Sequence, residues 1–161
     1  MIHSARAYNN LIMKKIFTII KIFFVYLFLI SSGAAKESDY LKKGIELFQK
    51  KEFDKSKILF ERDIVFDPKS EKSYLYLAKI FMKRENIEQE EINLKNVLSL
   101  NPQNDEAIYM LTLIKIEQSD YSGAEELINK FNLVCKSFCS KKGEIESKLK
   151  KLKPENAKNN N

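Results

Sequence analysis

Cys135 and Cys139 are the residues of this 161-residue chain whose spacing first suggests chemistry. They are its only cysteines, and a pair four residues apart could form a disulfide, act as a redox couple or bind a metal ion. A copper or zinc site needs more ligands than two thiolates, and the chain has a single histidine, His3. We therefore predict no metal site and no cofactor.

Other arrangements that support catalysis are missing from the sequence. Its 4 glycines form no glycine-rich phosphate loop. Two pairs of adjacent acids, Glu90-Glu91 and Glu125-Glu126, fall in segments with helical spacing. Neighbouring side chains on a helix diverge by about 100°, so neither pair can form a carboxylate dyad. We interpret both pairs as solvated helix faces and predict that the protein is not an enzyme.

Residues 1–35 have the pattern of a secretory signal peptide. Lys14 and Lys15 precede an apolar stretch, residues 16–30, and small residues follow it at 31–35. A positive segment, a short apolar segment and small residues direct export and cleavage, in that order. Met13 is a more natural start than Met1, because the residues before it add nothing to this signal.

The apolar stretch is shorter than the roughly 20 residues that span a bilayer comfortably. We therefore expect cleavage after Ala34 or Ala35 and a periplasmic or secreted protein. The alternative is an inner-membrane anchor formed by residues 16–35, which requires the segment to stay uncleaved.

Export bears on the two cysteines, because disulfides persist in oxidising compartments. A disulfide between Cys135 and Cys139 closes a small loop and would constrain the unfolded chain by only ~2 kcal/mol. Its main effect would be to fix the angle of the segment that follows. A redox-active pair, to which Lys136 lends some support, and a pair of reduced thiols are the alternatives.

The net charge of +6 is unevenly distributed along the chain. Residues 1–35 contribute +4, residues 36–135 contribute −3, and residues 136–161 contribute +5. A nucleic-acid interface needs basic residues clustered on the fold itself. Because the middle of the chain is slightly acidic, we predict no nucleic-acid binding.

A period of 34 residues runs through that middle segment. Tyr40 recurs as Tyr74 and Ile108, and Pro68 recurs as Pro102. If each 34-residue unit folds as a pair of helices, the pair exposes an apolar face that it cannot bury alone, so neighbouring units must stack. Further residues that agree with the repeat are Gly44, Leu47, Phe53, Ser56, Phe60, Leu77, Ala78, Phe81, Ile87, Leu94, Leu111, Tyr121, Ala124 and Ile128.

This pattern resembles the tetratricopeptide repeat family, whose 34-residue unit is a helix–turn–helix. The resemblance covers residues 37–136 and departs from the family where Glu90 replaces a small residue and where Lys115 and Lys136 occur in the third unit. It implies an all-α fold, an α-solenoid of about three repeats. The repeat domain spans 36–136, with units at 37–70, 71–104 and 105–136.

The apolar spacing predicts two helices per repeat and a C-terminal capping helix. Ile145, Leu149 and Leu152 form a narrow stripe between lysines, which suits the polar cap that ends a repeat array. We assign the cap to residues 137–153, and residues 154–161 should be disordered. The predicted helices are 38–51, 54–66, 71–84, 87–100, 104–118, 121–132 and 140–152.

The resemblance also implies a binding groove on the concave side, lined by the first helix of each repeat. The positions that line it in the family correspond here to Leu41, Ile45, Phe48, Lys72, Leu75, Lys79, Met82, Lys83, Tyr109, Leu113 and Ile116, with Glu106 and Glu117 beside them. An apolar groove with lysines at its centre would suit an amphipathic helix or an extended, partly acidic segment. Alternatively, Leu41, Leu75 and Tyr109 pack under the terminal helix or against a second copy.

These inferences predict an exported tetratricopeptide repeat protein that binds a protein or peptide partner. It would act as an adaptor or scaffold in the bacterial cell envelope. The alternative is a self-associating or membrane-tethered structural subunit of an envelope assembly complex, which would form homo-oligomers or retain its apolar N-terminal segment.

Overall fold

The computed structural model describes residues 38–153, together with Met13, Ile16 and residues 18–21. Apart from those few N-terminal positions, the predicted signal peptide (1–35) lies outside the described residues, as does the predicted tail (154–161). Within the described ranges, every helix is too short or too polar to span a bilayer.

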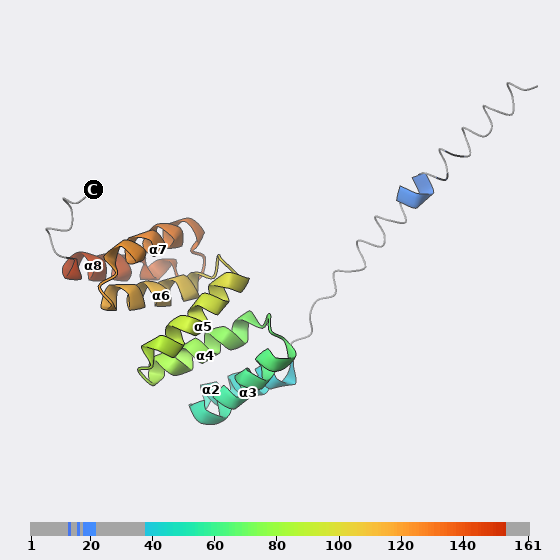
Figure 1. Ribbon diagram of the computed structural model, residues 1–161, viewed down its shortest axis with the longest axis horizontal. Helices are drawn as coiled ribbons and strands as arrows, with labels where there is room; N and C mark the ends of the chain where they lie inside the picture. The colour runs from blue at the N-terminus through green and yellow to red at the C-terminus, as the bar shows by residue number, and fades with distance from the viewer. Residues whose placement is uncertain (1–12, 14–15, 17, 22–37, 154–161) are drawn as a thin grey trace, which may run out of the picture. The chain divides into compact units, whose positions relative to one another are not determined.

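Three helical hairpins follow one another between residues 38 and 134, and a further helix comes after them (Figure 1). Their bounds lie within two residues of those predicted from the apolar spacing, and a 3-10 turn, Cys139–Lys141, precedes the last helix. The helices are α2 (Asp39–Gln49), α3 (Phe53–Phe66), α4 (Glu71–Lys83), α5 (Ile87–Leu100), α6 (Asp105–Glu117), α7 (Tyr121–Val134) and α8 (Lys142–Leu152).

The hairpins stack in chain order. Within each hairpin the two helices pack against each other, and contacts of α3 with α4 and of α5 with α6 join successive hairpins. Figure 1 shows α4 and α5 between the first hairpin and the group formed by α6, α7 and α8. Helix α8 packs on both α6 and α7 and ends the stack. The predicted all-α solenoid with a capping helix is confirmed.

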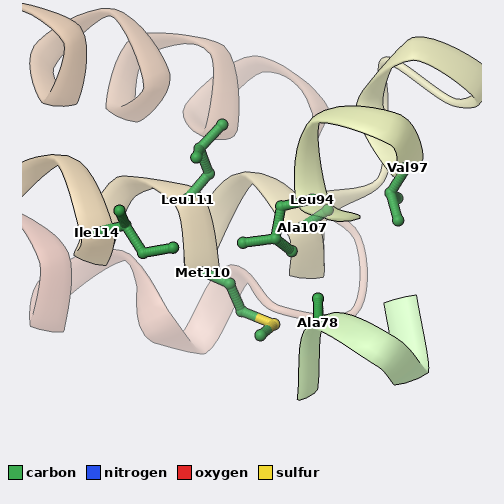
Figure 2. Close-up of a cluster of buried hydrophobic side chains, with 7 residues drawn as sticks. All are labelled: Ala78, Leu94, Val97, Ala107, Met110, Leu111 and Ile114. Atoms are coloured by element: carbon green, nitrogen blue, oxygen red, sulfur yellow. The ribbon is translucent and has the colours of Figure 1, made fainter. Parts of the chain in front are cut away.

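The buried apolar side chains form three clusters along the stack of hairpins. At the joint between the second and third hairpins, apolar side chains of α4, α5 and α6 form one buried cluster (Figure 2). They are Ala78, Leu94, Val97, Ala107, Met110, Leu111 and Ile114. A second cluster surrounds Phe60 in the first hairpin, and a third, which includes Ile145 and Leu149, lies beneath α8.

The helices of the first hairpin cross where their residues are smallest. A Cβ atom added to Gly44 would lie 2.6 Å from Cε1 of Phe60, whose side chain is fully buried. The hydroxyl of Ser56 donates a hydrogen bond of 2.8 Å to the carbonyl of Gly44. The two backbones can therefore approach this closely only because neither residue has a larger side chain.

The turn between the two helices has the same geometry in every hairpin. Lys51, Glu85 and Ser119, spaced 34 residues apart, adopt φ values of 61°, 56° and 61°. The amide that follows each of them donates to the carbonyl five residues earlier, at 2.9 to 3.0 Å, as in a Schellman motif. Left-handed backbone costs an L-residue roughly 1–2 kcal/mol. The packing of the hairpins must therefore hold these turns in place.

An acidic side chain at the start of the first helix closes the loop at the end of the same repeat. The Glu71 carboxylate accepts hydrogen bonds from the side-chain amides of Asn101, at 3.0 Å, and Asn104, at 2.6 Å. One repeat later, Asp105 accepts from the backbone amides of residues 136–138 at 2.6 to 2.9 Å. These bonds lower the pKa of Asp105, although its partial burial opposes them.

The joint between the first two repeats contains a buried carboxylate, Asp63, which is 1% exposed. The hydroxyls of Ser70 and Ser73 donate to it at 2.5 and 2.6 Å, and Ser38 donates a third hydrogen bond. The equivalent positions 34 and 68 residues later hold Val97 and Phe131, so a polar cluster here replaces apolar contacts. Three hydroxyl donors satisfy the carboxylate that this replacement buries.

The crossing in the first hairpin leads to a test. Gly44→Ala should lower the free energy of unfolding by about 1–3 kcal/mol, because the new methyl group overlaps a ring that stacks on Tyr76 and cannot retreat. Urea unfolding followed by circular dichroism measures the change. Gly143→Ala is the matched control, since a Cβ there meets nothing within 4 Å and should stabilise α8. Equal stability of Gly44→Ala and the unsubstituted protein would contradict this packing.

Candidate functional site

The residues predicted to line the groove differ in how far solvent reaches them. Lys72, Met82 and Lys83 are exposed. Six others are partly buried, which leaves one side of each available to a partner: Ile45, Phe48, Leu75, Lys79, Tyr109 and Leu113. Leu41 and Ile116 are buried.

For Leu41 and Ile116 the structure corrects the groove assignment. Leu41 is 6% exposed and packs in the core cluster that surrounds Phe60. Ile116 is 1% exposed and belongs to the core cluster that also contains Ile145 and Leu149 of the capping helix. Both side chains stabilise the stack and neither can contact a partner in this arrangement.

The central lysine of the predicted basic patch has its charge compensated within the fold. Lys79 Nζ lies 2.8 Å from a carboxylate oxygen of Glu106 on the next repeat and 5.1 Å from the ring centroid of Tyr76. Both side chains of the ion pair are about one-fifth exposed. This pair ties α4 to α6, and the groove therefore presents less positive charge than its sequence suggests.

A pocket of about 310 Å³ opens beside this ion pair. Three predicted groove residues line it: Met82 from α4, and Tyr109 and Leu113 from α6. The other lining residues are Glu90, Glu106, Met110, Ile114, Glu117, Phe138 and Lys141. Its walls are apolar and aromatic, with a few charged groups between them, which is the usual composition of a binding pocket.

Glu90 is the lining residue that the sequence interpretation missed. It was assigned with Glu91 to a solvated face, but its side chain is 6% exposed, so that assignment is wrong. The available signal was its position in the repeat, where the family pattern asks for a small residue. Glu91 next to it points elsewhere and pairs with Lys95 at 2.8 Å and Lys115 at 3.0 Å.

The two neighbouring acids have opposite electrostatic environments. Burial, reinforced by the nearby Glu117 charge, raises the pKa of Glu90 to about 7. Hydrogen bonds from Lys95, Gln118 and Lys115 lower the pKa of Glu91 to about 2. One helix turn therefore carries a carboxylate that resists ionisation beside one that is ionised at any physiological pH.

The C-terminal side of the pocket is formed by the segment between α7 and α8. The Tyr109 hydroxyl donates to Glu144 at 2.7 Å, and its ring lies 5.9 Å from that of Phe138. Burial and this carboxylate raise the pKa of Tyr109 to about 12. A disulfide joins Cys135 and Cys139, whose Cα atoms are 5.2 Å apart, and so closes the loop that presents Phe138.

A second hollow, of about 440 Å³, lies between α7 and α8. An ion pair of 2.6 Å between Lys153 and Glu125 lies at this hollow, and Ile128 and Leu149 contribute to its lining. None of the predicted groove residues reaches it. In the part of the chain that the structure describes, no group of three or more acidic, histidine or cysteine side chains could hold a metal ion.

Comparison with known proteins gives matches only among solved structures; no protein-family model and no curated protein matches the chain. The Yersinia enterocolitica type III secretion chaperone SycD, in complex with a peptide of the translocator YopD, has a TM-score of 0.63 and 10% identity. That alignment covers 73% of this chain and 95% of that chain.

Two further matches come from eukaryotes. The TPR2B domain of yeast Sti1, in complex with pHsp70, has a TM-score of 0.64 and 14% identity over 72% of this chain and 100% of that chain. The Sgt2 TPR domain from Aspergillus fumigatus has a TM-score of 0.61 and 19% identity over 81% of this chain and 89% of that chain.

The described helices thus form an α-solenoid of stacked hairpins closed by a capping helix. More narrowly, this solenoid has the tetratricopeptide-repeat fold, as the sequence resemblance implied.

The raised pKa of Glu90 predicts how stability depends on pH. The folded protein keeps this proton up to about pH 7, whereas an unfolded chain releases it near 4.5, so stability falls as pH rises through that window. Glu90→Gln removes this loss. The gain in unfolding free energy of the variant over the unsubstituted protein should therefore be about 1–3 kcal/mol larger at pH 8 than at pH 5. Glu106, Glu117 and Lys141 line the same pocket and are unchanged.

Urea unfolding at the two pH values measures this difference. Glu91→Gln is the matched control and should lower the free energy of unfolding by a similar amount at both pH values, because the low pKa of Glu91 stabilises the folded protein fully at any pH above about 4.5. If Glu90→Gln follows the pH dependence of the unsubstituted protein, the carboxylate is not buried as described.

Proposed function

We propose that this protein is exported to the bacterial cell envelope and binds a segment of a client protein in the groove formed by α4 and α6. It acts there as an adaptor or scaffold and not as an enzyme. Tetratricopeptide-repeat structures similar to it include SycD with a YopD peptide and the TPR2B domain of Sti1 with pHsp70, which supports a protein partner.

The observation that carries this proposal is the pocket between the second and third repeats. Its lining combines Met82, at the end of α4, with Tyr109 and Leu113 of α6, so the first helices of two successive repeats form one surface. Met82 is 41% exposed at this surface. An apolar groove with charged groups at its edge suits a guest with an apolar face.

A structural subunit that associates with itself is the second candidate. It is supported by exposed apolar side chains on α3, where Val65 is 77% and Phe66 is 72% exposed. The Phe66 ring stacks on Tyr40 with a centroid distance of 5.5 Å, so it is held in place at the surface. Light scattering separates the two candidates: an oligomer that Val65→Glu converts into a monomer would favour the structural subunit.

Site-specific photo-crosslinking in the native cell tests the groove. A photoreactive amino acid at position 82 should give a crosslinked adduct with a partner protein, because this side chain lies at the pocket. The same substitution at Ile92 is the matched control, since Ile92 is 44% exposed on α5 and does not line the pocket. The same adduct from both positions, or none from position 82, would show that the groove assignment is wrong.

Export has a separate test. N-terminal sequencing of the protein recovered from the envelope fraction should give a chain that begins at Ala35 or Lys36, because small residues precede both positions. Replacing Phe23 and Phe24 with aspartate should block export and leave the precursor intact. Recovery of an exported chain that retains residues 13–35 would support the membrane-tethered alternative.

A further inference from the structure

Glu90 occupies a place that the other two repeats give to a small side chain. The positions 34 residues before and after it are Ser56 and Ala124, both fully buried where two helices cross. The partner position on the first helix is Gly44, Ala78 or Thr112. A glutamate at such a crossing has no room between the helices, and its side chain instead lines the neighbouring pocket.

No hydrogen bond or ion pair satisfies this carboxylate among the residues that the structure describes. The influences on the Glu90 carboxyl are burial and the like charge of Glu117. The other acids of the pocket are paired outside it, Glu106 with Lys79 at 2.8 Å and Glu117 with Lys148 at 3.0 Å. Solvent still reaches its oxygens at the pocket, since no fully buried side-chain oxygen of the described residues lacks a hydrogen-bond partner, but a charge on a side chain that is 6% exposed and has no protein partner is costly.

Among the described residues, the one basic side chain that lines the pocket already has partners. Lys141 pairs with Glu144 at 2.8 Å and lies 5.7 Å from the ring centroid of Tyr109. The remaining walls are apolar and include Met82, Met110 and Ile114. The pocket therefore offers a carboxylate in need of a counter-charge, surrounded by groups that suit methylene carbons.

We propose that this pocket binds a lysine or arginine side chain of the partner segment, with Glu90 as its counter-charge and the methionines against its methylene groups. The inference rests on the function proposed above, since it names the chemistry of the segment that the groove holds. It also reverses the preference expected from the lysines of the groove, which pointed to a partly acidic guest.

A long cationic side chain fits this pocket better than the alternatives. A small inorganic cation would need several oxygen ligands, and two of the three acids are held by lysines. An apolar guest alone would bury the carboxylate more deeply and leave it unpaired. Lysine and arginine supply both an apolar stem and a charged end, so they satisfy the walls and the carboxylate together.

The test uses a phage-displayed library of random peptides, selected at pH 8 on the immobilised full-length protein. Peptides retained by the unsubstituted protein should combine apolar residues with a lysine or arginine at one position. Changing that residue to glutamine in a selected peptide should weaken binding about tenfold. On Glu90→Gln, the same change should alter binding less than about twofold.

Glu91→Gln is the matched control. It removes the same charge from the neighbouring residue, whose carboxylate pairs with Lys115 and does not line the pocket. On the Glu91→Gln protein, changing the lysine or arginine of the selected peptide to glutamine should still weaken binding about tenfold. Glu90→Gln replaces an unpaired buried charge by a neutral group of the same shape, so it should fold at least as well as the unsubstituted protein.

The outcomes separate this inference from the proposed function. Selected peptides that are apolar but show no preference for lysine or arginine would overturn the cation pocket and leave the groove in place. An equal effect of Glu90→Gln and Glu91→Gln would also overturn it, because the preference would then follow from overall charge. If no peptide is enriched and position 82 gives no adduct, both proposals fail.

Discussion

The structure depends on how closely the two helices of a hairpin can cross. In the first hairpin Gly44 leaves room for the Phe60 ring, and the hydroxyl of Ser56 reaches the carbonyl of Gly44. Only small side chains allow this approach, and it brings the two helices near enough to bury one face together. Because the burial is incomplete within a single hairpin, the next hairpin must pack against it. The groove follows from this stacking, since it places the first helices of successive repeats side by side.

The second hairpin departs from this constraint, and its departure coincides with the pocket. Ala78 keeps the crossing narrow on α4, but α5 carries Glu90 where Ser56 and Ala124 occur elsewhere. A buried carboxylate without a partner lowers the stability of the fold, and sequences tend to break local rules of this kind at functional sites. The same carboxylate can be stabilised by a guest that carries the opposite charge. Stability and recognition therefore oppose each other at this one residue.

The 34-residue period predicted the helices and their order, because it reflects local spacing and stacking that any repeat of this type must satisfy. It could not predict which of the predicted groove positions join the core beneath the capping helix, and so Ile116 was assigned to the groove although it lies in one core cluster with Ile145 and Leu149. The period also could not predict the ion pair between Lys79 and Glu106, since that contact depends on how two successive repeats are placed relative to each other. For Glu90 the mismatch with the repeat pattern was visible, but its burial depends on neighbours from other helices, α4 and α6 among them.

The acidic residues at the start of α4 and of α6 have a consequence for the number of repeats that such a chain can contain. Glu71 binds the loop after α5, and Asp105 binds the backbone of residues 136–138 after α7, so each of these two units closes its own C-terminal loop. A gene duplication of one complete unit would reproduce that loop closure without any other change. The loop closed by Cys135 and Cys139 occupies the position at which a further unit would begin. An additional unit would therefore most simply be inserted before this loop in the chain.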